Sequence, residues 1–162
     1  MKKISKATTP DTIGLALADS PVGLLGYVLE KYSAGSFGFK KIIGTKDGGL
    51  DSFNRDDLLT IITHYWMTNT ITSSCRLYRS YVYAAVGDYP KNEISNYKTS
   101  EKVPVAVQYF KNEVTNIPYG YLKKRFLNLK RFNIMSQGGH FASFENPVLS
   151  AKDFIEFVLS VK

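Results

Sequence analysis

The sequence is poor in the residues that build disulfides and metal sites. Its 162 residues include one cysteine and two histidines. A single cysteine excludes an internal disulfide framework, and Cys75 with the widely separated His64 and His140 cannot supply the ligands of a zinc site. We therefore expect neither a metal nor a cofactor. Because no helix start or cation lies beside Cys75 to activate its thiol, we expect this residue to be a small buried side chain.

Long apolar segments are also lacking. No apolar run approaches the roughly 20 residues that a membrane-spanning helix needs. The first ten residues, MKKISKATTP, carry lysines but no apolar segment of the kind a signal peptide has behind them. We therefore expect no anchor or secretion signal in this chain, which on its own would be soluble or would aggregate.

Positive charge is in excess, with a formal net charge of +7. The densest basic segment, residues 121–132, alternates lysine and arginine with tyrosine and phenylalanine, a combination that suits a groove for single-stranded nucleic acid. Its apolar residues Leu122, Phe126 and Leu129, however, recur at helical spacing, which is typical of a surface helix that faces a core. We favour the solvated helix face and expect no nucleic-acid partner.

A helix is predicted near residue 20, with Asp19 or Ser20 as its N-cap and Pro21 as its first residue. The apolar residues of one helix face are Val22, Leu25, Val28 and Leu29. Residues 34–54, which are rich in glycine, are predicted to form a loop.

Residues 55–86 open with aspartates suited to a helix N-terminus and continue with a long, largely apolar pattern. The length predicts two helices that meet near residues 68–74. His64 lies in the first of them among apolar residues, and we interpret it as a packed helix histidine. We interpret Trp66 in the same way, as a packing residue.

The last third of the chain changes in character. Residues 87–102 are polar and read as a linker, and the β-branched run at 103–110 is typical of a buried parallel strand. A helix at 118–127, a second strand at 130–136 and a last helix capped by Ser150 complete the pattern. Strand, helix, strand and helix in this order predict a βαβ unit on a parallel sheet, so the fold class is α/β in this part of the chain.

Two polar residues follow the two predicted strands, Glu113 after the first and His140 after the second. In parallel sheets such loops meet at the carboxyl edge. Gly138 and Gly139 allow the sharp turn that presents His140. A carboxylate there can accept a hydrogen bond from the imidazole Nδ1 and stabilise the imidazolium that forms when Nε2 takes a proton. An acid followed by a late histidine matches the second and third members of an α/β-hydrolase triad.

The nucleophile of such a triad has no counterpart in this chain. The nucleophile elbow needs Gly-x-nucleophile-x-Gly, and the glycines at that spacing, Gly44 and Gly48, have Lys46 between them. We therefore expect no catalytic nucleophile here.

Four blocks of the sequence together resemble the C-terminal half of the microsomal-type epoxide hydrolases, including the insect juvenile hormone epoxide hydrolases. The blocks are TTPDTIGLALADSPVGLLGYVLEKYS, DGGLDSFNRDDLLTIITHYWMTNTITSSCRLYRS, VPVAVQYFKNE and GGHFASFENP. The resemblance implies the C-terminal part of an α/β-hydrolase fold, with the last strands of a parallel sheet and their helices. It implies a mostly helical cap or lid region at residues 1–98 and the core part at residues 99–162.

The resemblance also implies a two-step hydrolysis of lipophilic epoxides, of juvenile hormone or xenobiotic type, to diols. An aspartate forms an ester with the epoxide carbon, and water then hydrolyses that ester. His140 would be the general base, Glu113 the charge-relay acid and Tyr78 the cap residue that donates a hydrogen bond to the epoxide oxygen. The family's other cap tyrosine would fall near Lys2. The family suggests detoxification at the endoplasmic reticulum or microsomal membrane, with membrane association only through a segment that is not in this chain.

Two functions remain open at this point. The chain is either the part of an epoxide hydrolase that supplies His140, Glu113 and Tyr78, or a non-catalytic relative that binds a lipophilic ligand or a partner protein. For the first, we expect Glu113 and His140 to lie within hydrogen-bond reach, and the Tyr78 hydroxyl to face the same space as His140.

Overall fold

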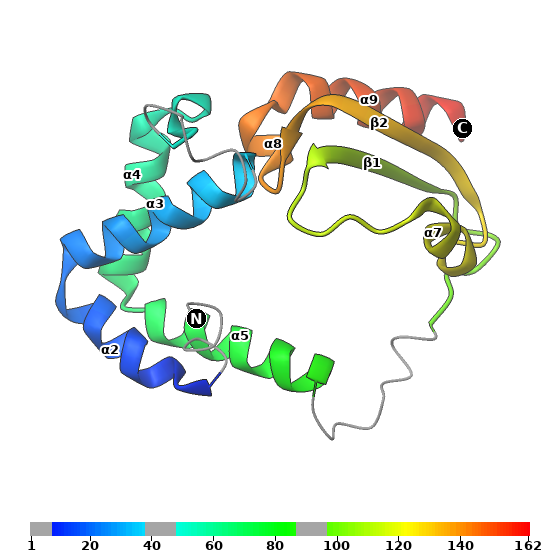
Figure 1. Ribbon diagram of the computed structural model, residues 1–162. Helices are drawn as coiled ribbons and strands as arrows, with labels where there is room; N and C mark the ends of the chain where they lie inside the picture. The colour runs from blue at the N-terminus through cyan, green and yellow to red at the C-terminus, as the bar shows by residue number, and fades with distance from the viewer. Residues whose placement is uncertain (1–7, 38–47, 87–96) are drawn as a thin grey trace. The chain divides into compact units, whose positions relative to one another are not determined.

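The structure is a computed structural model that describes residues 8–37, 48–86 and 97–162 (Figure 1). Lys2 and Lys46 lie outside the described residues, as does most of the predicted linker at 87–102.

The chain forms two compact units. The first unit comprises Met1–Glu30 and Asn54–Ser95, and the second comprises Lys31–Phe53 and Asn96–Lys162. The expected boundary after residue 98 lies close to the last of these divisions, whereas residues 31–53, which we assigned to the cap region, belong with the C-terminal unit. The assignment of cap and core stays a prediction.

The described part of the first unit is helical. Its elements are α2 (Pro10–Asp19), the first part of α3 (Pro21–Phe37), α4 (Arg55–Thr68) and α5 (Ile71–Val86). Helix α2, which the sequence analysis did not anticipate, packs along α5 (Figure 1). The two backbones approach closely, because a Cβ atom on Gly14 would lie 2.8 Å from the Cα atom of Thr72.

Helix α3 begins at Pro21 as predicted, and the Ser20 hydroxyl accepts a hydrogen bond from the Gly23 N–H at 3.0 Å. The predicted apolar face is wrong at one end. Leu24 is fully buried and Val28 is buried, whereas Val22 is 74% exposed. The helix also continues to Phe37, and a 3-10 turn, η1, forms at Leu50–Ser52, so the predicted loop at 34–54 is shorter than expected.

The two predicted helices within 55–86 are confirmed. The Asn54 side chain caps α4 by accepting hydrogen bonds from the N–H groups of Asp56 and Asp57. Asn69, in the left-handed region at φ 53°, ends α4 between the two helices. Cys75 is buried, as expected.

The interpretation of His64 as a packed histidine is wrong, because the residue is exposed on α4. Trp66 is also only partly covered, with 36% of its surface exposed. Ile62, a buried residue of α4, lies two residues before His64 and therefore on the opposite side of the helix, because successive residues are about 100° apart around a helix axis.

The second unit contains the predicted βαβ arrangement. Its elements in chain order are the end of α3, η1, β1 (Val105–Asn112), α7 (Tyr119–Arg125), β2 (Leu129–Gly139), α8 (Ala142–Glu145) and α9 (Pro147–Ser160). Strands β1 and β2 pair in parallel, with Val105 opposite Leu129 and Asn112 opposite Gly139. Helix α9 runs beside the two strands (Figure 1). This is the sheet and helix arrangement of an α/β protein.

Two details of this unit differ from expectation. The last helix begins at Pro147 after Asn146, so Ser150 is a buried residue within α9 rather than its cap. Strand β1 is also less buried than predicted, since only Phe110 among its residues is classed as buried.

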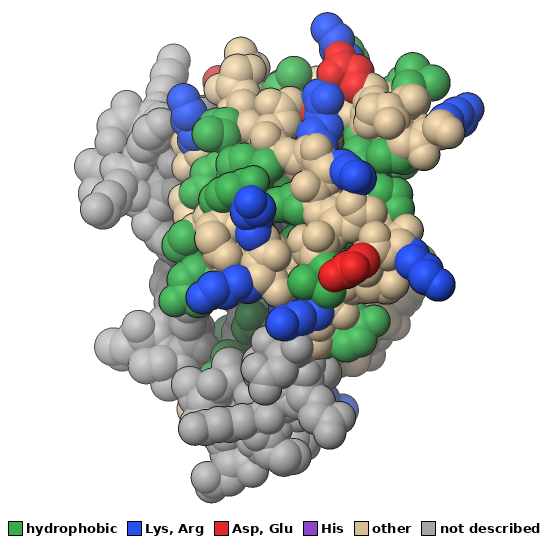
Figure 2. Space-filling view, turned by 90° about the vertical axis from the view of Figure 1, so that its right-hand side faces the viewer, with side chains coloured by type: hydrophobic (Ala, Val, Ile, Leu, Met, Phe, Trp, Pro, Cys, Tyr) green, Lys and Arg blue, Asp and Glu red, His purple; other side chains and the backbone are tan. Residues whose placement is uncertain are grey.

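The basic segment is helical only in its first part. Leu122 of α7 is buried, while Lys123, Lys124 and Arg125 are exposed, as a solvated helix face requires. The helix ends at Arg125, however, so Phe126 and Leu129 do not continue its apolar face, and Leu129 begins β2. On the side of the molecule seen in Figure 2, lysine and arginine side chains are separated by hydrophobic and neutral ones and do not merge into one patch.

Candidate active site

The carboxyl ends of the two parallel strands bring Glu113 and His140 together. Glu113 directly follows β1 and His140 directly follows β2, and the last residues of the strands, Asn112 and Gly139, are register partners. Parallel strands end at the same edge of a sheet, so the loops that follow them are neighbours.

The glycine pair before His140 is required by space as well as by backbone angle. Gly138 has φ 102°, which side-chain-bearing residues rarely adopt. A Cβ atom on Gly139 would lie 2.6 Å from the carbonyl oxygen of Gly35 and 2.9 Å from that of Ser36. The end of β2 is therefore packed directly on the backbone of α3, and the His140 N–H donates a hydrogen bond to the Gly35 carbonyl at 3.1 Å.

The predicted contact of the acid and the histidine is confirmed, since His140 Nδ1 lies 2.7 Å from Glu113 Oε1. The same oxygen accepts a hydrogen bond from the Val114 N–H, also at 2.7 Å. An ionised carboxylate can only accept, so with Glu113 ionised Nδ1 carries the proton of this contact, and in the neutral imidazole Nε2 keeps a lone pair. The side chain of His140 is 49% exposed and that of Glu113 is 28% exposed. The pair can therefore act as an oriented base that water reaches.

An aromatic cluster supports the segment that carries His140. Its members are Tyr32, Phe53, Phe141 and Phe144. The rings of Tyr32 and Phe141 are stacked, with centroids 4.2 Å apart, and Phe141 also contacts the His140 ring edge to face. Aromatic pairs of this kind stabilise the folded state by more than the burial of their surface alone would give. Here they hold Phe141, the residue after His140, in place.

Glu145 is a second carboxylate at this site, and the sequence analysis missed it. Its Oε1 accepts a hydrogen bond from the Phe141 N–H at 3.0 Å. Burial raises the pKa of Glu145, and the nearby negative charge of Glu113 raises it further. The hydrogen bonds from the backbone of Phe141 and Gly139, and the closeness of His140, act in the opposite direction but do not outweigh burial. A glutamate shortly after a helix start, whose side chain reaches back to the backbone, is the sequence signal that could have identified it.

Tyr78 lies on α5, in the first unit, and is half exposed. Glu113 and His140 lie in the second unit. The expectation that the Tyr78 hydroxyl shares a space with His140 therefore stays a prediction.

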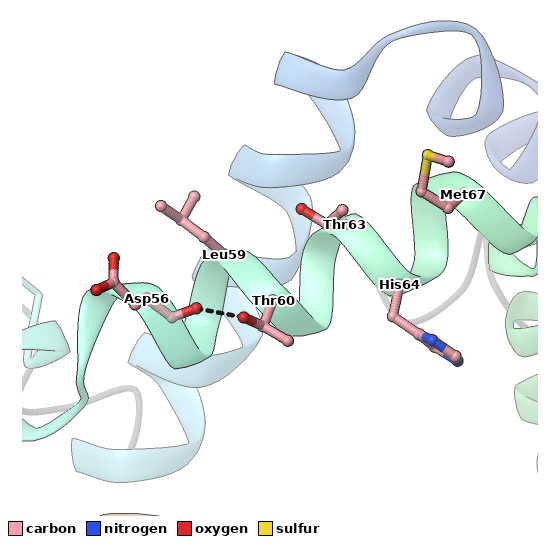
Figure 3. A pocket seen from close by; sticks show the side chains of 6 residues that line it. All are labelled: Asp56, Leu59, Thr60, Thr63, His64 and Met67. Carbon is pink, nitrogen blue, oxygen red and sulfur yellow. Dashed lines mark hydrogen bonds between the residues drawn. The ribbon is translucent and has the colours of Figure 1, made fainter.

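A shallow hollow lies along α4, within the first unit (Figure 3). It is lined by Asp56, Leu59, Thr60, Thr63, His64 and Met67. The Thr60 hydroxyl donates to the Asp56 carbonyl, a bond internal to the helix. A single helix face lines this hollow, and His64 there has no carboxylate partner like that of His140 among the hydrogen bonds of the described residues.

Residues 8–37, 48–86 and 97–162 contain no group of three histidine, cysteine, aspartate or glutamate side chains that could hold a metal ion. Within the same ranges, none of the helices has the length and apolar character to cross a membrane.

Comparison with known proteins identifies relatives. No family model matches the chain. It is 40% identical over 154 residues to epoxide hydrolase 1 of Sus scrofa, which covers 94% of this chain and 32% of that protein. It is 39% identical over 148 residues to the juvenile hormone epoxide hydrolase of Manduca sexta, which covers 91% of this chain and 30% of that protein.

The fold comparison agrees. The crystal structure of juvenile hormone epoxide hydrolase from the silkworm Bombyx mori matches with a TM-score of 0.78 and 32% identity, over 98% of this chain and 38% of that one. The chain spans about a third of the length of the curated relatives it matches. It is thus a homologue of the epoxide hydrolases and has a part of their α/β-hydrolase fold.

Proposed function

We propose that this chain is the water-activating part of an epoxide hydrolase, with His140 as general base and Glu113 as charge-relay acid. The observation that carries the proposal is the 2.7 Å contact between His140 Nδ1 and Glu113 Oε1 at the carboxyl ends of two parallel strands. The similarity to epoxide hydrolases over nearly the whole chain supports it.

The chemistry follows from the orientation of the imidazole. Glu113 holds the proton on Nδ1, so Nε2 can take a proton from a water molecule while the water oxygen attacks an ester carbonyl. The carboxylate then stabilises the imidazolium that forms. The ester is made when an aspartate opens the epoxide, and the sequence has no nucleophile elbow of its own to provide that aspartate. In this proposal Tyr78 donates a hydrogen bond to the epoxide oxygen as negative charge develops there.

For the substrate, we propose a lipophilic epoxide of juvenile hormone or xenobiotic type that is converted to a diol. Relatives are named as juvenile hormone epoxide hydrolases, and this is the support for the first type. The family resemblance also leads us to propose detoxification at the endoplasmic reticulum membrane as the setting of the whole protein.

The test uses an ester substrate, because the proposed base activates water for attack on an ester carbonyl. The chain is incubated with p-nitrophenyl acetate, and hydrolysis is measured in H₂O and D₂O. We expect His140→Ala to lower the rate about tenfold, less than the roughly hundredfold or more that is typical of general-base catalysis, since the imidazole is half open to solvent. Glu113→Gln should also lower the rate, and a slower reaction in D₂O would distinguish proton transfer from nucleophilic attack by the imidazole.

His64→Ala is the matched control, because His64 is an exposed histidine in the first unit. Equal rates for the His64→Ala and His140→Ala variants would refute the proposed role and favour a non-catalytic, ligand-binding relative. In a second arm, styrene-type and juvenile-hormone-type epoxides should give no diol above background. Diol formation that disappears in His140→Ala would show that the chain contains a nucleophile of its own.

A further inference from the structure

Glu145 lies at the end of α8, one short turn after His140, and its side chain points back toward the segment it follows. Its Oε1 accepts the hydrogen bond of the Phe141 N–H at 3.0 Å. The carboxylate thus holds the main chain immediately after His140.

This arrangement carries an electrostatic cost. The carboxylate is partly buried, and it lies close enough to the like charge of Glu113 for that charge to disfavour its ionised form. Helix α8 has only four residues and Glu145 is the last of them. A glutamate that served only to cap α8 could therefore turn its side chain to solvent and avoid the like charge of Glu113. The carboxylate nevertheless stays turned inward and keeps the hydrogen bond from the Phe141 N–H.

We propose that Glu145 is a positioning residue, whose carboxylate fixes the backbone directly after His140 so that the imidazole Nδ1 stays on Glu113. The inference rests on the proposed function, in which His140 is the general base. It assigns to Glu145 no contact with the substrate. What matters in this role is an acceptor oxygen at the reach of a glutamate, not the negative charge.

The proposed role predicts different effects for three substitutions of Glu145. Glu145→Gln keeps an acceptor oxygen at the same reach and should preserve the position of the imidazole. Glu145→Asp keeps the charge but is one methylene shorter, and Glu145→Ala has neither, so both should release the segment. Glu156→Ala is the control, because Glu156 lies on α9 of the same unit and bonds to Arg131 instead.

The readout is the tautomer of His140 in the 162-residue chain, taken from the ¹⁵N shifts of the imidazole at a pH where the ring is neutral. In the wild-type chain and in the Glu145→Gln and Glu156→Ala variants, we expect His140 to be the Nδ1–H tautomer that Glu113 selects. In Glu145→Asp and Glu145→Ala, we expect the ratio to shift about tenfold toward Nε2–H, the factor that loss of one hydrogen bond to a charged group brings. His64 should not change in any variant. Thermal unfolding of each variant is recorded in parallel.

Three results would overturn the proposal. The first is an unchanged His140 tautomer in folded Glu145→Ala and Glu145→Asp. The second is a shift in Glu145→Gln but not in Glu145→Asp, because charge rather than reach would then matter. The third is unfolding of both the Ala and the Asp variants, because Glu145 would then hold the whole unit rather than the imidazole. Failure of the ester assay with the expected order of tautomers would refute the proposed function and leave the positioning role intact.

Discussion

A methyl group added to Gly35 tests how tightly the His140 segment is packed on α3. A Cβ atom at this position would lie 2.6 Å from Phe141 Cε2 and 3.2 Å from His140 Cβ. Gly120, on α7 of the same unit, is the matched control, because a Cβ atom there meets nothing within 4 Å. Both substitutions are Gly→Ala within a helix, so they differ in what the new methyl group touches.

The expected magnitudes follow from this difference. Alanine stabilises a helix interior over glycine by up to about 1 kcal/mol, a gain that both variants share in part. At Gly35 the new methyl group overpacks the site, which costs about 1–3 kcal/mol. The Phe141 ring cannot simply move aside, because it is stacked on Tyr32 at 4.2 Å. We expect Gly120→Ala to leave the free energy of unfolding equal or higher, and Gly35→Ala to lower it by about 1–2 kcal/mol.

The assay is urea unfolding followed by circular dichroism, together with hydrogen exchange of the His140 amide, which donates to the Gly35 carbonyl. Gly35→Ala should shift the midpoint to lower urea and speed up exchange of that amide. If Gly35→Ala proves as stable as Gly120→Ala and the His140 amide exchanges at the wild-type rate, the reasoning about close packing at this site is wrong.

Two further predictions concern stability in each unit. Burial opposes ionisation of Asp153, but hydrogen bonds donated by Asn133 and Arg131 outweigh it and lower the pKa below 3.8. The stabilisation by Asp153 is therefore present above pH 3.8 and lost as the pH falls through the folded-state pKa. Asp153→Asn should lower the free energy of unfolding at pH 7 by about 1–3 kcal/mol and make that free energy decline less steeply in acid. Urea titrations from about pH 7 to about pH 2 measure both effects. An equally steep decline in the variant would count against this assignment. Asn54→Ala should cost about 1 kcal/mol in thermal unfolding, because it removes the N-cap of α4, and an unchanged melting temperature would contradict the capping role.

Much of the second unit was predictable from local signals. The β-branched run before Asn112 predicts β1, and the glycine pair before His140 marks the end of β2, whereas the helix periodicity around Leu122 overestimates the length of α7. Once two parallel strands are assigned, the meeting of Glu113 and His140 follows from sheet geometry alone.

Features that depend on other parts of the chain were not predictable in the same way. Val22 and Leu24 are both apolar residues of one helix, and only the packing of neighbouring elements decides that Leu24 is buried while Val22 is exposed. His64 has an apolar sequence neighbourhood, yet it lies on an exposed face of α4. Helix α2 contains Ile13, Leu15 and Leu17, but the sequence does not show which element these residues pack against; the helix packs along α5, where Gly14 lets the two backbones approach.

The sequence by itself determined the type and order of β1, α7, β2 and α9, though not the short helix α8. It also identified the histidine and the acid of the candidate site, because backbone propensity, turn chemistry and strand order are local properties. The tertiary structure alone decided how that histidine is held. Gly35 is over a hundred residues away from His140 in the chain, yet its carbonyl accepts the His140 N–H, and Tyr32 of the same helix stacks on Phe141. Glu145 is held in part by a local contact, the bond from the Phe141 N–H four residues before it, whereas its closeness to Glu113 depends on the pairing of β1 and β2. The contacts of Gly35 and Tyr32 join segments that lie far apart in the sequence and meet only through folding, so no local pattern encodes them.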